Sequence, residues 1–346
     1  MDDGASAVKV VVTGGAGYIG SHTCKALARA GHQPIAVDCL VTGHREAVKW
    51  GPLHELDIRH GDAIGRLLER LMPDAIIHLA ASAIVRDSMS DPFGYFDNNV
   101  GGTTSLLKAA TAAGIERVVF SSSCATYGAP SRLPITEDSP QLPSNPYGET
   151  KLVCERLLKW SEEAFDTRWV ALRYFNVAGA DPEGEIGEVH SDETHLIPLV
   201  LRAAAGDGTA LSVFGTDHAT EDGTALRDYV HVSDIADAHV AAVDYLVRGG
   251  VSGAFNLGSG RPMSVRDVVR VVEDIIGLPV PFRDMPRRLG DPPALWADPR
   301  KARQMLGWVA RRSSIEDIVR SAWAWEQRLK DGDPWNRRSQ TMLVPS

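Results

Sequence analysis

A short apolar run followed at once by a glycine-rich turn is the feature that most restricts the fold of this chain. The run from Val8 to Val12 precedes glycines at positions 14, 15, 17 and 20. Their spacing satisfies both G-x-x-G-x-x-G and G-x-G-x-x-G, which join a buried strand to the start of a helix. Glycine is required because the backbone turns sharply and the helix packs closely on its strand. The sequence therefore predicts a strand, turn and helix at the start of an α/β sheet.

Short β-branched runs alternate with helical stretches through the first half of the chain. The predicted strands are residues 8–12, 34–37, 75–79, 117–120 and 169–172, and the predicted helices are residues 21–30, 63–71, 100–113 and 147–164. Buried strands that alternate with helices indicate a parallel sheet covered on both faces. We therefore predict an α/β fold with a Rossmann-type doubly wound parallel sheet and a smaller C-terminal α/β lobe for the substrate.

The division between these two parts is predicted to be discontinuous. After residue 174 the alternation gives way to long loops rich in Gly, Asp and Glu, and it returns as a helix at 233–247 and a strand at 255–258. We expect the first domain to contain residues 1–178 plus about 231–258. The second lobe would then contain residues 179–230 plus about 259–346.

Charge and composition exclude several classes of partner. The formal net charge is −9 and the sequence has no basic block, which disfavours nucleic acid because binding to its backbone needs clustered Lys and Arg. The four cysteines lack metal-binding spacing, so we expect reduced thiols, a cytoplasmic protein and no metal. The sequence has neither a leader-like start nor a run of about 18 apolar residues, so we expect no membrane association.

The glycine turn predicts a binding site for a dinucleotide. Amides at the start of the following helix face a diphosphate with the favourable end of the helix dipole, and Tyr18 and Ile19 lie inside this turn. Asp38 ends the second strand, 18 residues beyond Gly20, where a carboxylate accepts hydrogen bonds from a ribose diol and repels a 2′-phosphate. Because strand, turn, helix and acid agree, the sequence favours an NAD-binding site over a glycine-rich loop that binds no cofactor.

Tyr147 and Lys151 are four residues apart, so they share one face of a predicted helix. A free tyrosine titrates near pH ~10. Positive charge from Lys151 and a nicotinamide ring would favour the phenolate and give a proton acceptor for a sugar or alcohol hydroxyl. Ser123 ends the preceding apolar strand and could relay this proton. The alternative is a solvated helix face that matches Y-x-x-x-K by chance, but the glycine turn favours catalysis.

Through these residues the chain resembles the extended short-chain dehydrogenase/reductase family, and within it the UDP-glucose (UDP-galactose) 4-epimerases. Four longer segments carry the narrower resemblance and occur in order over nearly the whole chain. They are RYFNVAGA at 173–180, ETHLIP at 193–198, DGTALRDYVH at 222–231 and RRLGD at 287–291.

The resemblance implies an isomerase that holds NAD and interconverts UDP-glucose and UDP-galactose. Tyr147 would remove the proton of the sugar 4-hydroxyl while hydride leaves C4 for the nicotinamide. The 4-keto sugar would then turn over, and hydride would return to its opposite face without net oxidation. The first domain would bind NAD and the second lobe would bind the nucleotide sugar.

The resemblance also implies roles for further residues. Asp57 and Ile58 would contact adenine, Asn176 the substrate diphosphate, and Asp291 a ribose hydroxyl. Arg227 and Arg288 would neutralise phosphate, unless they only form surface ion pairs with Asp228 or Asp291. Together, motifs and resemblance assign catalysis to Ser123, Tyr147 and Lys151; cofactor contacts to Gly14, Gly17, Tyr18, Ile19, Gly20, Asp38, Asp57, Ile58, Leu79, Ala80, Asn98, Tyr147, Lys151 and Phe175; and substrate contacts to Ser123, Tyr147, Asn176, Leu196, Arg227, Arg288 and Asp291.

Several alternatives stay open at this point. Cys124 and Ala125 follow the serine run, a pattern shared with pentose 4-epimerases, so UDP-xylose and UDP-arabinose are competing substrates. A sugar-nucleotide dehydratase would need an Asp-Glu pair at these two positions, and a non-catalytic NAD-binding protein would not need Ser123, Tyr147 and Lys151 together. Leu295 leaves 2-acetamido sugars open, and we assign no role to His195. Helices 100–113 and 147–164 are expected to pair in a homodimer.

Overall fold

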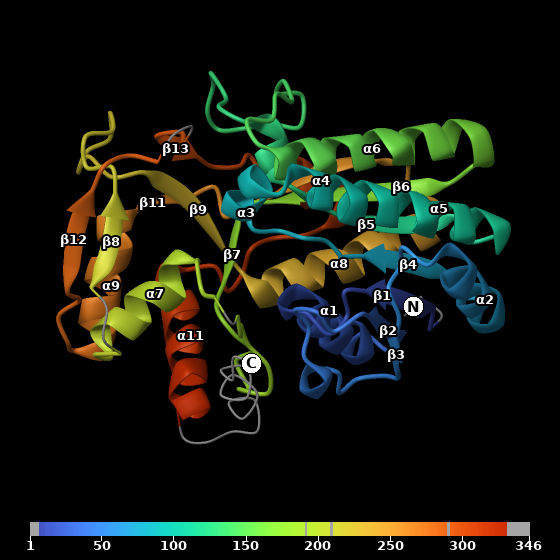
Figure 1. The fold of residues 1–346 in the computed structure, drawn as a ribbon, viewed down its shortest axis with the longest axis horizontal. Helices are drawn as coiled ribbons and strands as arrows, with labels where there is room; N and C mark the ends of the chain where they lie inside the picture. The colour runs from blue at the N-terminus through green and yellow to red at the C-terminus, as the bar shows by residue number, and fades with distance from the viewer. Residues whose placement is uncertain (1–6, 191, 208–209, 289–290, 331–346) are drawn as a thin grey trace, which may run out of the picture.

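A parallel sheet of seven strands forms the centre of the protein (Figure 1). The structure is a computed structural model that describes residues 7–190, 192–207, 210–288 and 291–330. The strand order is β10-β6-β5-β4-β1-β2-β3, and every neighbouring pair is parallel. The strands are β1 (Lys9–Thr13), β2 (Gln33–Asp38), β3 (Leu53–Glu55), β4 (Ala75–His78), β5 (Arg117–Ser123), β6 (Arg168–Tyr174) and β10 (Gly253–Leu257). The chain winds outward from β1 in both directions, which confirms the predicted Rossmann-type fold.

Helices cover both faces of this sheet (Figure 1). α1 (Tyr18–Arg29) and α8 (Val232–Val247) lie on one face, and α2 (Gly61–Leu71), α5 (Gly102–Ala112) and α6 (Pro146–Phe165) lie on the other. Alternate residues of β1 serve the two faces: Val10 and Val12 pack in the core with Leu27 of α1, whereas Val11 packs with Leu68 of α2. This is the period of two that a strand buried on both sides requires.

The sequence patterns missed the short elements. β3 has three residues and lies at the edge of the sheet, so it carries no apolar run that would reveal it. The segment predicted as one helix from residue 100 begins as a π-helical stretch, Phe96–Gly101, which runs into α5. The other short helices are α3 (Val85–Ser90), α4 (Pro92–Tyr95), and the 3₁₀ turns Arg45–Ala47 and Cys124–Tyr127.

Beyond residue 174 the chain builds a smaller α/β region, at the left of Figure 1. β9 (Leu226–His231) is its central strand and pairs with β7 (Asn176–Ala178), β11 (Pro262–Ser264) and β13 (Ala294–Leu295), while β8 (Leu211–Phe214) pairs with β12 (Phe282–Met285). α7 (Leu196–Ala204), α9 (Val265–Ile276) and α11 (Ile315–Lys330) share one apolar core there.

The two regions interleave. β7 pairs with β9 although the predicted bounds place it in the first domain. α10 (Arg300–Leu306), which these bounds place in the second lobe, packs in the core formed by α8 and β10. The domain bounds therefore stay a prediction, and their portions at 1–6 and 331–346 lie outside the described residues. Among the helices that the structure describes, none has the length and apolar character of a membrane span.

Four buried histidines make the fold sensitive to acid. Burial lowers the pKa of His22, His231 and His239 to about 4 and that of His78 to about 3. These side chains stay neutral in the folded protein, whereas the unfolded chain binds protons below its ordinary histidine pKa of ~6.5. Because the unfolded state then binds more protons, folding stability is full above that pH and is lost as the pH falls.

Between pH 7 and pH 5, each of these histidines should lower the free energy of unfolding by about 2 kcal/mol. Urea unfolding at the two pH values measures this loss. The substitution His239→Gln should reduce this loss of unfolding free energy by the contribution of one histidine. The matched change His60→Gln, at an exposed position, should leave the loss unchanged. An equal loss in parent and His239→Gln proteins would contradict this account.

Candidate active site

The glycine turn joins the carboxyl end of β1 to α1 in a space that admits no side chains. A Cβ atom on Gly20 would lie 2.0 Å from the carbonyl oxygen of Gly14. Gly14 has φ of +72°, and its Cβ would lie 2.7 Å from the backbone nitrogen of Ala80. The predicted residues Gly14, Gly20, Leu79 and Ala80 therefore meet at one edge of the sheet. The first amides of α1, which have no partner within a helix, lie at this edge.

Asp38 ends β2 beside this turn. Its Oδ2 accepts a hydrogen bond from the amide of Ala16 at 3.0 Å, and its Oδ1 accepts one from the amide of Leu40 at 2.8 Å. Burial raises the pKa of the carboxyl group, and the two backbone hydrogen bonds act in the opposite direction. Each carboxylate oxygen has a second lone pair. Asp38 thus braces the turn and retains the capacity to accept hydrogen bonds from a diol.

Other predicted cofactor residues are held by contacts within the protein. The Tyr18 hydroxyl donates to the carbonyl of Gly179 at 2.5 Å, and Asn98 donates to the Ser82 hydroxyl at 3.0 Å. Asp57 forms an ion pair with Arg59 at 2.7 Å. Three others are apolar: Ile19 packs against the core, and Ile58 and Phe175 are buried. Their roles toward a cofactor stay predictions.

The predicted catalytic residues come from two elements. Ser123 is the last residue of β5, and Tyr147 and Lys151 lie in the first turns of α6. The start of α6 is fixed because the Asn145 side chain accepts a hydrogen bond from the Gly148 amide at 2.8 Å. α6 packs against β5, the Ser123 side chain is near enough to influence the pKa of Tyr147, and all three predicted residues are buried. The structure thus brings them together at the edge that carries the glycine turn.

Burial dominates the electrostatics of this group. Burial raises the pKa of Tyr147 to about 12, although the Ser123 side chain acts to lower it. Burial also lowers the pKa of Lys151 to about 8. The Lys151 Nζ donates to the carbonyl of Ser121 at 2.8 Å and lies 5.9 Å from the centre of the Tyr147 ring. In the chain alone, burial therefore outweighs the groups that favour the phenolate, and the joint effect of Lys151 and a nicotinamide stays a prediction.

A buried ion pair beneath the serines was missed by sequence reasoning. Arg173 of β6 and Glu155 of α6 contact each other at 2.6 Å, and the hydroxyl of Ser122 donates to Glu155 at 2.5 Å. Arg173 also donates to the Tyr127 hydroxyl at 2.7 Å. This network ties α6 to the strands that end at Ser123. The sequence shows both charged residues, but it gives no sign that they meet.

The predicted phosphate-binding residues lie in the smaller region. Arg227 of β9 pairs with Asp291, and Arg288 lies 4.1 Å from the centre of the Phe214 ring. The ion pair between Arg227 and Asp291 is one of the two pairings that the sequence left open. The other candidate partner, Asp228, accepts hydrogen bonds from Ser259. Asn176 begins β7 and Leu196 begins α7.

Arg227 also connects this region to the catalytic strand. Burial raises the pKa of the Cys124 thiol to about 12, and the positive charge of Arg227 acts to lower it. Cys124 directly follows Ser123. The contact between the two regions runs through Leu295, which pairs with Arg227 and packs in one apolar cluster with Cys124.

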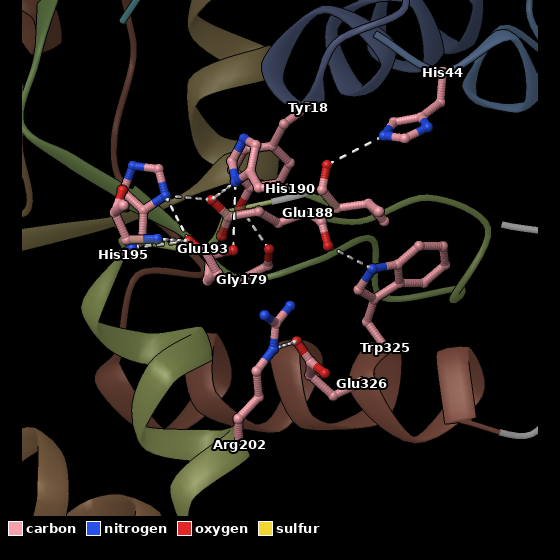
Figure 2. Close-up of polar contacts among 12 residues, drawn as sticks. Tyr18, His44, Gly179, Glu188, His190, Glu193, His195, Arg202, Trp325 and Glu326 are labelled. Atoms are coloured by element: carbon pink, nitrogen blue, oxygen red, sulfur yellow. Dashed lines mark hydrogen bonds and ion pairs between the residues drawn. The ribbon is translucent and has the colours of Figure 1, made fainter. Parts of the chain in front are cut away.

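A group of acids and histidines also went unrecognised in the sequence. Glu188, His190, Glu193 and His195 converge between β7 and α7, close to Tyr18 (Figure 2). Burial acts to lower the pKa of His195, but hydrogen bonds to Glu188 and Glu193 raise it to about 10. The spacing E-x-H-x-x-E-x-H is the signal in the sequence that could have indicated this group.

Comparison with known proteins identifies the family. Residues 10–258 match the model of the "NAD dependent epimerase/dehydratase family". The chain belongs to this family. A UDP-glucose 4-epimerase from Rhizobium meliloti (strain 1021) is 50% identical over 323 residues, which are 93% of this chain and 98% of the relative. One from Lacticaseibacillus casei is 47% identical over 324 residues, which are 93% of this chain and 98% of the relative.

Solved structures agree with the family assignment. A UDP-glucose 4-epimerase from Brucella ovis in complex with NAD has a TM-score of 0.90 and 50% identity, covering 92% of this chain and 98% of that protein. A UDP-glucose 4-epimerase from Stenotrophomonas maltophila, with bound NAD and formylated UDP-arabinopyranose, has a TM-score of 0.91 and 38% identity and covers 94% and 99%. The cradle at Gly14 and Gly20, which side chains would fill, and the carboxylate of Asp38 fit the NAD of this family.

Adding a side chain inside the glycine turn should weaken the binding of NAD. In the Gly20→Ala protein, the new methyl group overlaps the Gly14 carbonyl, so the turn must open. We expect affinity for NAD to fall by roughly tenfold or more, as measured by calorimetric titration. The matched change Gly65→Ala, where no atom lies within 4 Å of the added Cβ, should leave affinity unchanged. Equal affinity in both variants, with circular dichroism confirming that both fold, would refute this function of the turn.

Proposed function

We propose that this chain is an NAD-dependent UDP-sugar 4-epimerase that interconverts UDP-glucose and UDP-galactose. The single observation that carries the proposal is the grouping of Ser123, Tyr147 and Lys151 at the sheet edge that also holds the glycine turn. A substrate bound at this place would contact both a proton carrier and the dinucleotide. The UDP-glucose 4-epimerases that match nearly the whole chain support the same reaction.

In this mechanism Tyr147 takes the proton of the sugar 4-hydroxyl and later returns it. Its pKa of about 12 indicates that the chain alone does not hold it as a phenolate. When bound, NAD would supply the added positive charge and a reversible hydride acceptor for C4. Ser123 acts to lower the pKa of Tyr147, and its hydroxyl would orient the sugar 4-hydroxyl and give the proton a path. Lys151 contributes charge from below and holds the end of β5 through Ser121.

The smaller region would hold the UDP group. Arg227 and Arg288 offer planar guanidinium groups suited to phosphate oxygens. Because Arg227 already pairs with Asp291, phosphate binding would release this carboxylate or leave it to accept a ribose hydroxyl. If the protein anchors only the UDP group, the 4-keto sugar can turn over while the UDP group stays bound. We therefore place the substrate between the two interleaved regions, as the predicted domain bounds suggest.

A second candidate substrate pair is UDP-xylose and UDP-arabinose. The Stenotrophomonas maltophila protein, described as a UDP-glucose 4-epimerase, holds formylated UDP-arabinopyranose. Incubation with separate UDP-hexoses and UDP-pentoses, followed by chromatographic separation of the C4 epimers, tests both candidates. Faster conversion of UDP-galactose than of UDP-arabinose supports the proposal. A preference for the pentose would favour the alternative, and no conversion of either would refute epimerase activity.

Removing the phenol oxygen separates catalysis from cofactor binding. The Tyr147→Phe protein should keep its NAD yet lose turnover by about 10²- to 10⁴-fold, because the proton acceptor is gone while the fold is kept. Initial rates of UDP-galactose conversion and the NAD content of the purified protein provide the two measurements. Tyr245→Phe is the matched control, since the hydroxyl of this α8 tyrosine accepts a hydrogen bond from the amide of Val251 and has no part in the proposed chemistry. An unaltered rate in the Tyr147→Phe protein would exclude the phenol as proton carrier.

We also propose a cytoplasmic homodimer in which α5 and α6 pair with those of a second copy. Free thiols at all four cysteines suit a reducing compartment. α5 and α6 lie side by side on one face of the sheet (Figure 1). Large apolar side chains are exposed on α6 and the neighbouring α4, including Trp160 and Phe93. Exposed patches of this kind mark interfaces between proteins.

Sedimentation velocity tests the dimer. The parent protein should sediment as a dimer, and Phe93→Glu should shift it toward monomer because the new charge would be buried at the interface. The control Val251→Glu changes an exposed valine between α8 and β10, away from this face. A monomeric parent protein, or dimers that persist in Phe93→Glu and dissociate in Val251→Glu, would refute the proposed face.

A further inference from the structure

Four side chains outside the proposed catalytic group point toward one another. They are Glu188 and His190 in the loop after β7, and Glu193 and His195 just before α7 (Figure 2). Each residue offers one ligating atom, and these four atoms all lie within 4.8 Å of one another. Two imidazole nitrogens and two carboxylate oxygens thus converge on a single point from a short segment of chain.

The distances match those around a shared cation. The Nδ1 atom of His195 lies 2.8 Å from Oε1 of Glu188 and 3.1 Å from Oε1 of Glu193. The Nδ1 atom of His190 lies 3.3 Å from Oε1 of Glu188 and 3.4 Å from the other oxygen of Glu193, Oε2. Ligands at zinc distances of ~2.0–2.1 Å in a tetrahedron lie about 3.3 Å from one another. The observed nitrogen–oxygen separations scatter around that edge length.

Hydrogen bonding alone explains the arrangement less well. Two imidazolium ions would balance the charge of two carboxylates, but each presents a single Nδ1 proton to both acids. The two contacts of His190 are longer than ordinary N–H···O hydrogen bonds. A cation at the centre can contact all four ligands at once, which a single shared proton cannot do.

Burial and neighbouring contacts hold the acids in place. The Glu188 and Glu193 side chains are 7% and 2% exposed, and like charges buried this closely require positive charge beside them, which a bound divalent ion would supply when the imidazoles are neutral. The amides of Thr194 and His195 both donate to Glu193 at 2.8 Å, which fixes the direction of its carboxylate. Such outer contacts are typical of the groups that orient metal ligands.

We propose that Glu188, His190, Glu193 and His195 bind one divalent transition-metal ion of the zinc class. Imidazole ligands favour such ions over Ca²⁺ and Mg²⁺, which prefer oxygen alone. Four protein ligands close the coordination sphere, which is the pattern of structural rather than catalytic sites. The ion would fasten the loop after β7 to the start of α7, close to Tyr18 of the cofactor turn.

A second acidic group in the same loop makes a useful contrast. Asp181, Glu183 and Glu185 surround the ammonium group of Lys25 at 2.7, 2.8 and 2.5 Å. Their shared cation is therefore a lysine of α1, and no metal is required there. The four-residue group contains no lysine or arginine among its members, and its nitrogens are those of imidazoles.

Metal analysis of the NAD-containing protein tests the proposal. The protein is treated with a chelator, dialysed against Zn²⁺ and then against metal-free buffer, and its bound metal is measured by mass spectrometry. We expect one retained zinc per chain and a rise in the thermal unfolding midpoint of several degrees, since an ion bound only by the folded state stabilises it. Substituting Co²⁺ should give the visible absorption of tetrahedral coordination.

Matched variants make the outcome decisive. His190→Ala and, separately, His195→Ala should lose the retained zinc and the zinc-dependent rise in midpoint, whereas His60→Ala, an exposed histidine at the start of α2, should keep both. Two variants are used so that misfolding of one does not decide the result. Absence of retained zinc in the parent protein, or equal retention in all three variants, would overturn the proposal. These readouts do not depend on epimerase activity.

Discussion

The close approach of α1 to the end of β1 is the constraint on which the rest of the structure depends. A side chain at Gly20 would collide with the backbone of Gly14, so the helix can begin at this edge only because both positions lack a Cβ. The same approach leaves room for a dinucleotide and sets the start of α1 against the carboxyl end of the sheet. Parallel pairing of β1, β4 and β5 then brings Ala80 and Ser123 to the same edge.

Burial at that edge shapes the chemistry as much as charge does. It raises the pKa of Tyr147 and lowers the pKa of Lys151, so both groups are shifted toward their neutral forms. Because burial disfavours the phenolate, Tyr147 needs added positive charge from a bound cofactor before it can accept a proton from the substrate. Beneath it, the ion pair of Arg173 with Glu155 keeps α6 fixed against the strands, so the phenol and the serine stay in register.

Local patterns in the sequence predicted the parts of the fold in which pattern and packing agree. The buried runs of β1, β4, β5 and β6 are β-branched and bounded by turn residues, and the amphipathic helices between them follow directly. Short elements at edges, such as β3, are set by their neighbours in the sheet and carry little pattern of their own. The glycine turn and the Tyr147-to-Lys151 spacing were visible because their chemistry is local.

By itself, the sequence determined the glycine turn, the alternation of strands and helices, and a tyrosine and lysine on one helical face, because each depends on residues close together in the chain. Only the tertiary structure decided that Arg227 pairs with Asp291, that Glu155 meets Arg173, and that two acids and two histidines converge before α7. These contacts join side chains whose distances and burial arise when separate segments pack together. Spacing along a chain does not contain that information.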